Sequence, residues 1–569
     1  MRQTPPLRIA AALLGAAALM LVTAGCSDPE PERELAFAGP EDEALINAEQ
    51  LESLGVEVTA TWDDPELTDD DPDLSDLRLL LDGDDRTDEA QVAEGRLVWS
   101  PSSLEDGERT IEVASDPTAL ESEDGDDASG DDGSSDDAGD GADDAELEVL
   151  QRWTFTVDAT PPEIEITQPD SAVIAGEEVT IAGTTDPGAT VSVNGHEAEA
   201  DDDGAFSITL DQAPEGELDV VATDRAGNQS DDVVELVTVP SRVEVDELRT
   251  VHVSFCGWLS PTLKEPIMDL IDEGLINAVQ LDLKDESGTI GYHTDNELAA
   301  TTGAADAACN FDLAEAVAEL HALEVPVIGR IVAFADPVLA QWAWDNDARD
   351  MVMQTEDGEM YVGRYAGFAN FANEDVVEYN LDIAEEAAAA GVDHILWDYI
   401  RKPDGVDARF PGLEGDPGEA VLDFTRRADE RIQRYGAKHG ASVYGVSADR
   451  PTEVAQPVTE MADYLDYVAP MIYPSHWGPG EYDVADPLMQ PYDIIAASLE
   501  KFLEATEGKR ARVAPWLEDS NYPISLGYPD RASYVEAQIE ATYDAGITEW
   551  LLWDSSVRYT DSAMIQPPS

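Results

Sequence analysis

Several short apolar runs in the C-terminal half of the chain each end in an acidic or aromatic side chain. The clearest run, residues 394–398, ends in Asp398, and Arg401 follows three residues later. Later runs deliver Asp449 and Glu518 in a similar way. Glycoside hydrolysis requires two carboxyl groups that flank one bond, one as an acid and one as a nucleophile or base. These residue types therefore indicate cleavage of a glycosidic bond.

The three acids can be assigned different roles. We expect Asp398 to act as nucleophile or base, with Arg401 keeping it ionised, because a neighbouring cation stabilises a carboxylate. Asp449 is the first candidate for the acid, because the only adjacent cation is the next residue, an arginine whose side chain can point away. Glu518 is the rival for that role. The alternative for each acid is structural, as a helix cap or as the partner of an arginine such as Arg330.

From about residue 248 to residue 562, predicted strands alternate with predicted helices. Amphipathic helices are expected at 315–323, 374–390 and 534–544. Eight strands are expected at 252–256, 278–284, 325–330, 394–398, 442–449, 468–473, 513–518 and 550–554. This alternation predicts a (β/α)₈ TIM barrel, in which the carboxyl ends of all strands meet on the face that holds the active site.

Other polar and aromatic side chains are expected to surround the acids on that face. Aromatic rings with polar edges suit a carbohydrate cleft. Asp282, Lys284 and Asp285 could equally form a structural cluster of charges, and Trp397 and Trp553 could pack inside the barrel. The residues expected to bind substrate are Asp282, Lys284, Arg330, Arg401, Tyr473, His476, Trp477, Trp516 and Asp554.

Two other hydrolytic chemistries lack their residues in this sequence. A metal hydrolase needs clustered histidines, whereas the seven histidines here are scattered and none form a His-x-His pair at a strand end. A serine nucleophile in a Gly-x-Ser-x-Gly turn is also absent from the sequence. We therefore expect no metal and no cofactor.

The barrel region resembles a known family. Residues 250–560 are similar to a family of glycosyl hydrolase domains first catalogued as a domain of unknown function and related to α-amylase-like barrels. This resemblance implies the TIM-barrel fold and an activity on O-glycosyl bonds. The stretches that carry it are 279–288, 329–337, 397–401, 446–449 and the long, unusual run 469–480.

The composition is strongly acidic. The chain has 124 Asp and Glu against 31 Lys and Arg, which gives a formal net charge of −93. Nucleic-acid binding needs basic patches, so we expect no nucleic-acid partner. A solvated acidic coat of the halophilic kind accounts for the excess. Binding of divalent cations by the Asp-rich runs is the alternative.

The first residues have the pattern of a bacterial export signal. Within residues 1–26, two arginines flank the start, an apolar core spans 9–22, and small residues lead to Cys26. Ala-Gly-Cys resembles a lipobox, in which the cysteine is lipidated and becomes the mature N-terminus, here followed by a polar tether at 27–35. We expect lipid anchoring on the extracellular face of the membrane, with plain secretion as the alternative. No other segment is long and apolar enough to span a bilayer.

Only two further cysteines follow. Cys256 is expected to end the first barrel strand, and Cys309 lies in the loop after the second strand. An exported location permits a disulfide between them. Two free buried thiols are the alternative, because spacing alone does not decide the pairing.

Two stretches before the barrel alternate apolar and polar residues with period two, as the strands of small β-sandwiches do. The first, 36–160, contains the acidic tract 115–148, which has almost no apolar residues and is expected to be a disordered hairpin insertion. The second, 161–242, carries the runs 188–195 and 222–229, which resemble bacterial immunoglobulin-like modules. It could be a spacer or could contact carbohydrate.

Together these features predict an exported, lipid-anchored glycoside hydrolase with an extracellular or cell-envelope polysaccharide as its substrate. The membrane would be its second partner. The alternative is a surface lipoprotein whose barrel binds glycan without hydrolysing it. Reducing ends released from a panel of polysaccharides would favour the enzyme.

Overall fold

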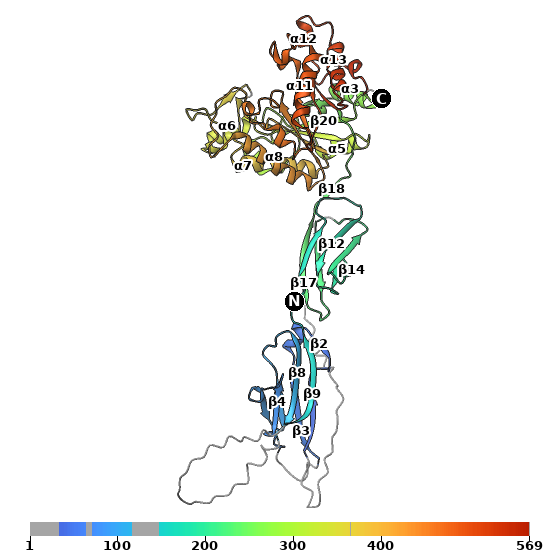
Figure 1. The fold of residues 1–569 in the computed structure, drawn as a ribbon, viewed down its shortest axis with the longest axis vertical. Helices are drawn as coiled ribbons and strands as arrows, with labels where there is room; N and C mark the ends of the chain where they lie inside the picture. Colours follow the sequence, from blue (N-terminus) through green and yellow to red (C-terminus); the bar gives the residue numbers. More distant parts are fainter. Residues whose placement is uncertain (1–32, 64–70, 117–146, 215, 365, 568–569) are drawn as a thin grey trace, which may run out of the picture. The chain divides into compact units, whose positions relative to one another are not determined.

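The computed structural model shows two β-sandwich modules followed by a barrel (Figure 1). Cys26, most of the tether and most of the acidic tract lie outside the residues that it describes. The described residues are 33–63, 71–116, 147–214, 216–364 and 366–567.

The first module contains two sheets whose buried faces form one core. In β3, Val56, Val58 and Ala60 point inward while the residues between them are more exposed, as period-two alternation predicts. One sheet has the order β1-β3-β7-β6 and the other β2-β9-β8-β4-β5. The elements are β1 Arg33–Ala38, β2 Ala44–Ile46, α1 Ala48–Glu52, β3 Val56–Trp62, β4 Leu77–Leu81, β5 Asp84–Asp85, η1 Thr87–Glu89, β6 Gln91–Ala93, β7 Arg96–Trp99, β8 Gly107–Ser115 and β9 Glu148–Val157.

The acidic tract connects two paired strands of this module. β8 ends at Ser115, β9 begins at Glu148, and these two residues face each other in an antiparallel ladder. The tract therefore starts and finishes at one end of a single hairpin.

The second module is also a β-sandwich. In β15, Phe206, Ile208 and Leu210 are buried and alternate with exposed residues. Its sheets have the orders β10-β12-β15 and β14-β13-β16-β17, with a separate pair β11-β18. The strands are β10 Ile164–Gln168, β11 Val173–Ile174, β12 Val179–Thr185, β13 Thr190–Val193, β14 His196–Glu199, β15 Ala205–Leu210, β16 Gly216–Thr223, β17 Gln229–Leu236 and β18 Thr238–Val239.

The C-terminal domain is a closed parallel barrel, which confirms the predicted fold class. The sheet order is β25-β24-β21-β20-β19-β29-β28-β26-β27, and β25 also pairs with β26. Pro515, which has no N–H to donate, separates β27 from β28, so these two short strands share one of the eight positions. The strands are β19 Arg249–Val253, β20 Ala278–Lys284, β21 Val327–Val332, β24 His394–Asp398, β25 Lys438–Tyr444, β26 Tyr467–Met471, β27 Arg512–Val513, β28 Trp516–Glu518 and β29 Trp550–Trp553.

Helices cover the outside of the barrel (Figure 1). The predicted helices correspond to α5, α7 and α13; in α7, Asn373 caps the first turn by accepting a hydrogen bond from the N–H of Val376. No helix in the described ranges combines the length and apolarity that a membrane span needs. The helices are α2 Phe255–Leu259, α3 Pro261–Asp272, α4 Glu297–Thr302, α5 Leu313–His321, α6 Pro337–Asp345, α7 Glu374–Ala389, α8 Pro417–Gln433, α9 Pro451–Val454, α10 Val458–Met461, α11 Pro491–Ala505, α12 Tyr522–Ser525 and α13 Arg531–Asp544; β22 Val362–Gly363 and β23 Ala366–Gly367 form a small hairpin.

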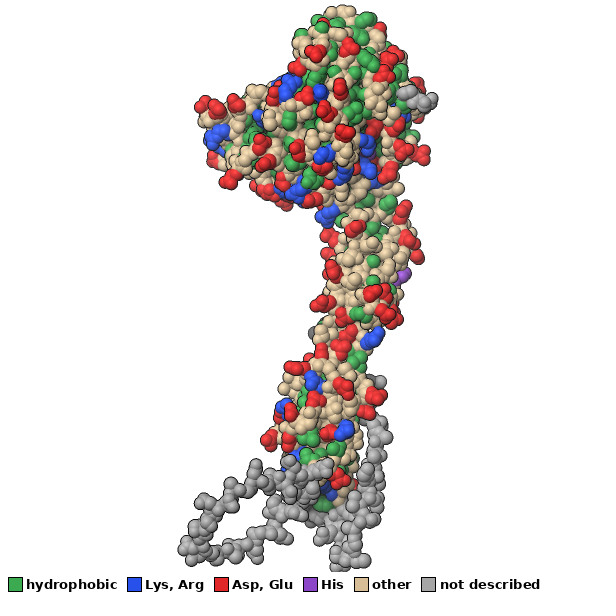
Figure 2. Space-filling view, in the orientation of Figure 1, with side chains coloured by type: hydrophobic (Ala, Val, Ile, Leu, Met, Phe, Trp, Pro, Cys, Tyr) green, Lys and Arg blue, Asp and Glu red, His purple; other side chains and the backbone are tan. Residues whose placement is uncertain are grey.

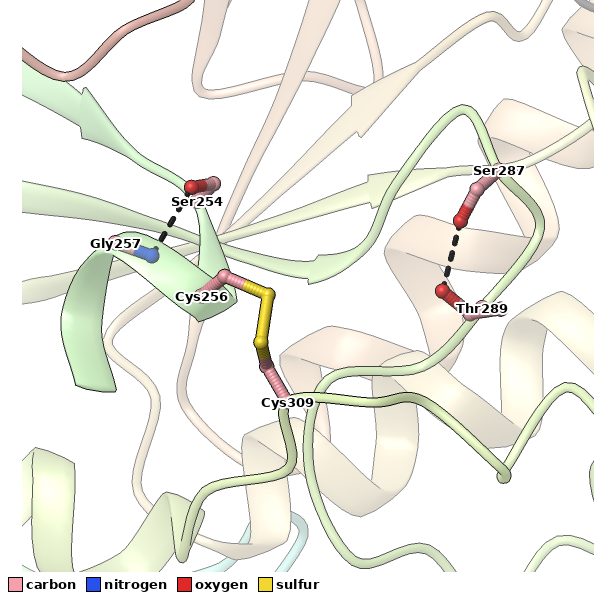
Figure 3. Close-up of a disulfide and its surroundings, with 6 residues drawn as sticks. All are labelled: Ser254, Cys256, Gly257, Ser287, Thr289 and Cys309. Carbon is pink, nitrogen blue, oxygen red and sulfur yellow. Dashed lines mark hydrogen bonds between the residues drawn. A yellow bond between two sulfur atoms is a disulfide. The ribbon is translucent and has the colours of Figure 1, made fainter. Parts of the chain in front are cut away.

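The position of Cys256 differs from the prediction. The first strand ends at Val253, and Ser254 caps α2 by accepting a hydrogen bond from the N–H of Gly257 (3.2 Å). Cys256 therefore lies in a short helix after the strand. It forms a disulfide with Cys309 (Figure 3).

The excess of acid lies on the surface. Figure 2 shows Asp and Glu side chains spread over the visible face of both modules and of the barrel, with fewer Lys and Arg between them. The barrel core beneath is built mainly from Val, Ile, Leu, Ala and aromatic residues. Most acidic side chains of the described residues therefore lie outside the core, and buried ones such as Asp282, Asp336 and Asp398 are paired with cations.

Candidate active site

A cavity of about 750 Å³ lies at the carboxyl ends of the barrel strands. Its walls come from the ends of β21, β24, β28 and β29 and from the loops that follow them and β20 and β26. Predicted site residues in its wall are Arg330, Asp398, Tyr473, His476, Glu518 and Asp554. Their convergence is the arrangement expected of a TIM-barrel active site.

Arg330 organises the carboxylates beneath this cavity. Its side chain is buried in β21 and donates hydrogen bonds to Asp282 (Nη1 to Oδ1, 2.9 Å), Glu286 and Asp398. A buried guanidinium must be paired, and its planar fork of N–H groups can serve several carboxylates at once. One cation therefore holds three acids, two from β20 and the loop directly after it and one from β24.

Asp282 pairs with Arg330 inside the barrel, beneath the cavity wall. His252 Nε2 lies 2.7 Å from Asp282 Oδ2, and the His252 ring stacks on Trp553 with centroids 3.9 Å apart. Burial alone would raise the pKa of Asp282, but His252 and Arg330 outweigh burial and lower that pKa to about 2. Asp282 is therefore an ionised, buried anchor and does not line the cavity.

Asp398 is the last residue of β24. Its Oδ2 accepts hydrogen bonds from Arg330, and its Oδ1 accepts one from the N–H of Tyr399 at 2.7 Å. Burial raises the pKa of Asp398, and the Arg330 guanidinium opposes that rise. Tyr399 adopts a left-handed backbone with φ of +53°, so the chain turns sharply directly after the acid.

Arg401 is not the cation that pairs with Asp398, contrary to the prediction. Its guanidinium lies 4.8 Å from the ring centroids of both Tyr399 and Tyr444. One nitrogen donates to the carbonyl of Lys402 at 3.2 Å. The sharp turn at Tyr399 separates the two side chains, so sequence proximity does not become contact. Arg330, on the neighbouring strand, takes the role.

Glu518 ends β28 and is held by uncharged donors. Its Oε1 accepts hydrogen bonds from the N–H of Ser475 (2.8 Å) and the hydroxyl of Tyr534 (2.7 Å), and its Oε2 accepts one from Ser475 Oγ (2.6 Å). Gln538 bonds the backbone of Glu518 in both directions. Burial raises the pKa of Glu518, and the hydrogen bonds from Ser475 and Tyr534 oppose that rise.

Tyr473 lines the same cavity as the two acids. It is buried at the cavity wall after β26, and its ring contacts His476 edge-on with centroids 5.0 Å apart. Burial raises the pKa of Tyr473, and the charges of Asp398 and Glu518 both add to the rise. The pKa of this one hydroxyl therefore depends on the charge of both carboxylates.

The structure does not bring Asp449 to this cavity. β25 ends at Tyr444, so Asp449 belongs to the turns that follow the strand, and its side chain is exposed. Burial raises the pKa of Tyr482, and the nearby Asp449 carboxyl adds to that rise. Arg450 forms an ion pair with Glu481 at 3.3 Å. Of the two candidate acids, only Glu518 shares the cavity with Asp398.

Three further candidates are structural. Lys284 is fully buried and pairs with Asp336 at 2.7 Å, away from the cavity. Trp516 is buried in the barrel and donates to Ser442 Oγ at 3.0 Å. Trp477 is also buried and donates to the carbonyl of Ile472 at 3.4 Å. None of the three lines the cavity.

Comparisons with known proteins identify families for the barrel and for the second module. The model of the family described as "putative glycosyl hydrolase domain" matches residues 250–559, more than half of the chain. The chain belongs to this family. A bacterial Ig domain matches residues 167–240, within the second sandwich. The predicted family and the predicted immunoglobulin-like module are therefore confirmed.

Solved structures with detectable similarity include three bacterial proteins. A hypothetical protein from Ruminiclostridium thermocellum is 25% identical over 36% of this chain and 98% of its own, with a TM-score of 0.29. The PgaB (BpsB) glycoside hydrolase domain from Bordetella bronchiseptica is 17% identical over 55% of this chain and 95% of its own, with a TM-score of 0.40. A chitinase from Chromobacterium violaceum is 10% identical over 55% of this chain and 96% of its own, with a TM-score of 0.34. No curated protein matches the chain.

Several cavity residues of this family member were not singled out from sequence as site residues. Glu286 lies two positions beyond β20 and pairs with Arg330. The acidic residues directly after β20 are the sequence signal that could have indicated Glu286 as a site residue. The others are Arg364, Tyr399, Met471, Ser475, Asp519, Ser520, Asn521, Tyr522, Ser555 and Ser556.

The arrangement offers acid and base groups rather than a metal cage. Among the residues that the structure describes, no group of three or more His, Cys, Asp or Glu side chains is placed to hold a metal ion. The carboxylates of Asp282, Glu286 and Asp398 are instead directed at the guanidinium of Arg330. Such a site can move protons and stabilise positive charge that develops on a substrate.

Proposed function

We propose that this family member is an exported glycoside hydrolase that cleaves O-glycosyl bonds in an extracellular or cell-envelope polysaccharide. Asp398 and Glu518 are its two working carboxyl groups. The supporting observation is that both acids end parallel barrel strands and line one cavity of about 750 Å³. Two carboxyl groups on either side of a glycosidic bond are sufficient for its hydrolysis.

The surroundings of the two acids divide their roles. Asp398 has a charged partner, Arg330, which favours its ionised form and suits a nucleophile or base. Glu518 has only neutral donors, and its burial favours the protonated form that a general acid needs. The role of general acid, predicted for Asp449, therefore passes to Glu518 in this proposal.

In the proposed reaction, Glu518 gives its proton to the leaving-group oxygen as the bond from that oxygen to the anomeric carbon breaks. Asp398 supplies electrons to the anomeric carbon directly or through a water that it deprotonates. Tyr473 and Trp553 provide ring surface in the cavity wall, and Asp554 provides a hydrogen-bond acceptor.

The test is a matched set of variants on the full chain. Asp398→Asn and Glu518→Gln should each lower the release of reducing ends from a polysaccharide panel by about 10²- to 10⁴-fold, the usual contribution of acid–base groups. Asp449→Asn is the control, because it removes an exposed acid outside the cavity. Unchanged turnover in either of the first two variants would refute the assignment. Glycan binding without any reducing ends would favour the binding-only alternative.

We also propose that the protein is held on the outer face of the cell membrane by lipid on Cys26. The disulfide between Cys256 and Cys309 supports export, since such bonds persist in oxidising compartments. The acidic surface is consistent with a protein that is exposed to a salt-rich medium outside the cell.

A further inference from the structure

Tyr522 differs from the other aromatic residues of the cavity. It is the first residue of α12, it lines the cavity, and 56% of its surface is exposed. Its backbone is fixed, because its N–H donates to Ser520 Oγ (3.1 Å) and its carbonyl accepts from Ser525 Oγ (2.6 Å). Within the described residues, its phenol ring has neither a hydrogen bond nor a ring contact.

The other cavity rings are held in place by the protein. Tyr473 and Tyr399 are buried, and Trp553 stacks on His252. These rings shape the cavity wall. Among the tyrosine and tryptophan residues in that wall, Tyr522 is the one whose side chain is exposed.

The segment that carries Tyr522 directly follows β28, the strand that ends in the candidate acid Glu518. All five residues from Glu518 to Tyr522 line the cavity. Asp519 fixes the segment by pairing with Arg531 and by accepting a hydrogen bond from the N–H of Thr560 at 2.7 Å. These contacts hold Tyr522 in the same cavity wall as the candidate acid Glu518.

We propose that Tyr522 is a stacking platform for a sugar ring beyond the two rings joined by the cleaved bond. This proposal rests on the proposed function and narrows it to chains of at least three sugars. A pyranose presents C–H groups on its face, and these pack on an aromatic ring, while its hydroxyls need polar neighbours. Ser520 and Asn521 supply such neighbours in the same wall.

The test measures binding separately from catalysis. Cello-, chito- and xylo-oligosaccharides of two to six units are titrated into full-length Glu518→Gln and into the same chain with Tyr522→Ala. Affinity should rise with length beyond two units in Glu518→Gln. Tyr522→Ala should remove that rise, an effect of about tenfold for the loss of one stacking contact. It should leave the affinity for disaccharides unchanged.

Two controls distinguish stacking from other effects. Tyr522→Phe keeps the ring and should bind like the parent. Leu526→Ala removes an equally exposed side chain, 55% of its surface, from the residue directly after α12 and outside the cavity wall, and should have no effect. The same gain of affinity with length in Tyr522→Ala, or no binding of any of these oligosaccharides, would overturn the proposal. Binding that depends on Tyr522 without hydrolysis by the natural sequence would overturn only the proposed function.

Discussion

Arg330 donates two hydrogen bonds to a single oxygen of Asp398, from Nε at 2.9 Å and from Nη2 at 2.7 Å. The two residues lie on neighbouring parallel strands, β21 and β24. The other oxygen of Asp398 accepts a backbone N–H. The orientation of the carboxylate is therefore set before any substrate arrives.

Replacing Arg330 with Met should remove activity and destabilise the barrel. Its loss leaves Asp282 and Asp398 buried without their cation, which costs about 3–5 kcal/mol in the free energy of unfolding. Chemical denaturation measures this loss. Arg401→Met is the matched control, because Arg401 pairs with rings rather than with Asp398. Equal stability of the two variants would contradict the central role of Arg330.

Tyr534→Phe should move the basic limb of the pH–rate profile to higher pH. The Tyr534 hydroxyl lowers the pKa of Glu518, so its removal lets burial raise that pKa further. A general acid with a higher pKa stays protonated to higher pH. Tyr528→Phe, which removes the hydroxyl of the adjacent ring, should leave the limb in place. A shift to lower pH in Tyr534→Phe would argue against Glu518 as the acid.

The buried pair of Lys284 and Asp336 should behave as a unit. Lys284→Met leaves Asp336 without its cation and should cost about 3–5 kcal/mol of unfolding free energy. The double variant Lys284→Met/Asp336→Leu removes both charges and should recover most of that loss. A double-mutant cycle on stability checks this coupling. Additive losses would show that the two charges act independently.

Stability should rise with salt. The net charge of −93 repels itself, and the screening length falls from about 10 Å at 0.1 M to about 3 Å at 1 M salt. Melting temperatures measured across that range, with NaCl and with MgCl₂ at equal ionic strength, test the effect. An equal response to both salts favours a solvated coat. A larger response to Mg²⁺ favours binding of divalent cations, and equal stability at all concentrations would exclude both.

Cys26→Ser should release the protein from the membrane fraction, because lipidation needs the thiol. Sedimentation of cell extracts with antibody detection measures the distribution. The matched control is Cys256→Ser, which breaks the disulfide with Cys309 and should leave the protein with the membranes. A Cys26→Ser variant that still sediments would contradict the lipid anchor.

Much of the barrel follows from sequence because its strands are apolar runs separated by amphipathic helices. Asp398 and Glu518 could be placed because each ends such a run. Asp449 could not, because β25 ends at Tyr444 and the turns beyond it have no marked sequence signal. The sequence specifies the end of a strand less well than its core, because the conformation there depends on the following loop as well as on the sheet.

Two further differences have local causes. Asp282 and Lys284 are two residues apart, so simple alternation would point both to one face. The register of β20 against β21 shifts between them, and Lys284 instead reaches Asp336. The arginine that pairs with Asp398 comes from a neighbouring strand, and a long-range contact of this kind is not visible in local spacing.

The pairing of Ser115 with Glu148 across the β8–β9 ladder has a consequence for engineering. Because the acidic tract leaves and re-enters the fold at adjacent positions, its length places little demand on the sheet, and doubling a loop costs only about 0.6 kcal/mol. Residues 117–146 are therefore a suitable place to exchange the native tract for a reporter domain whose own termini are close together. Such a fusion would carry its cargo on the first module and leave the barrel sequence unaltered.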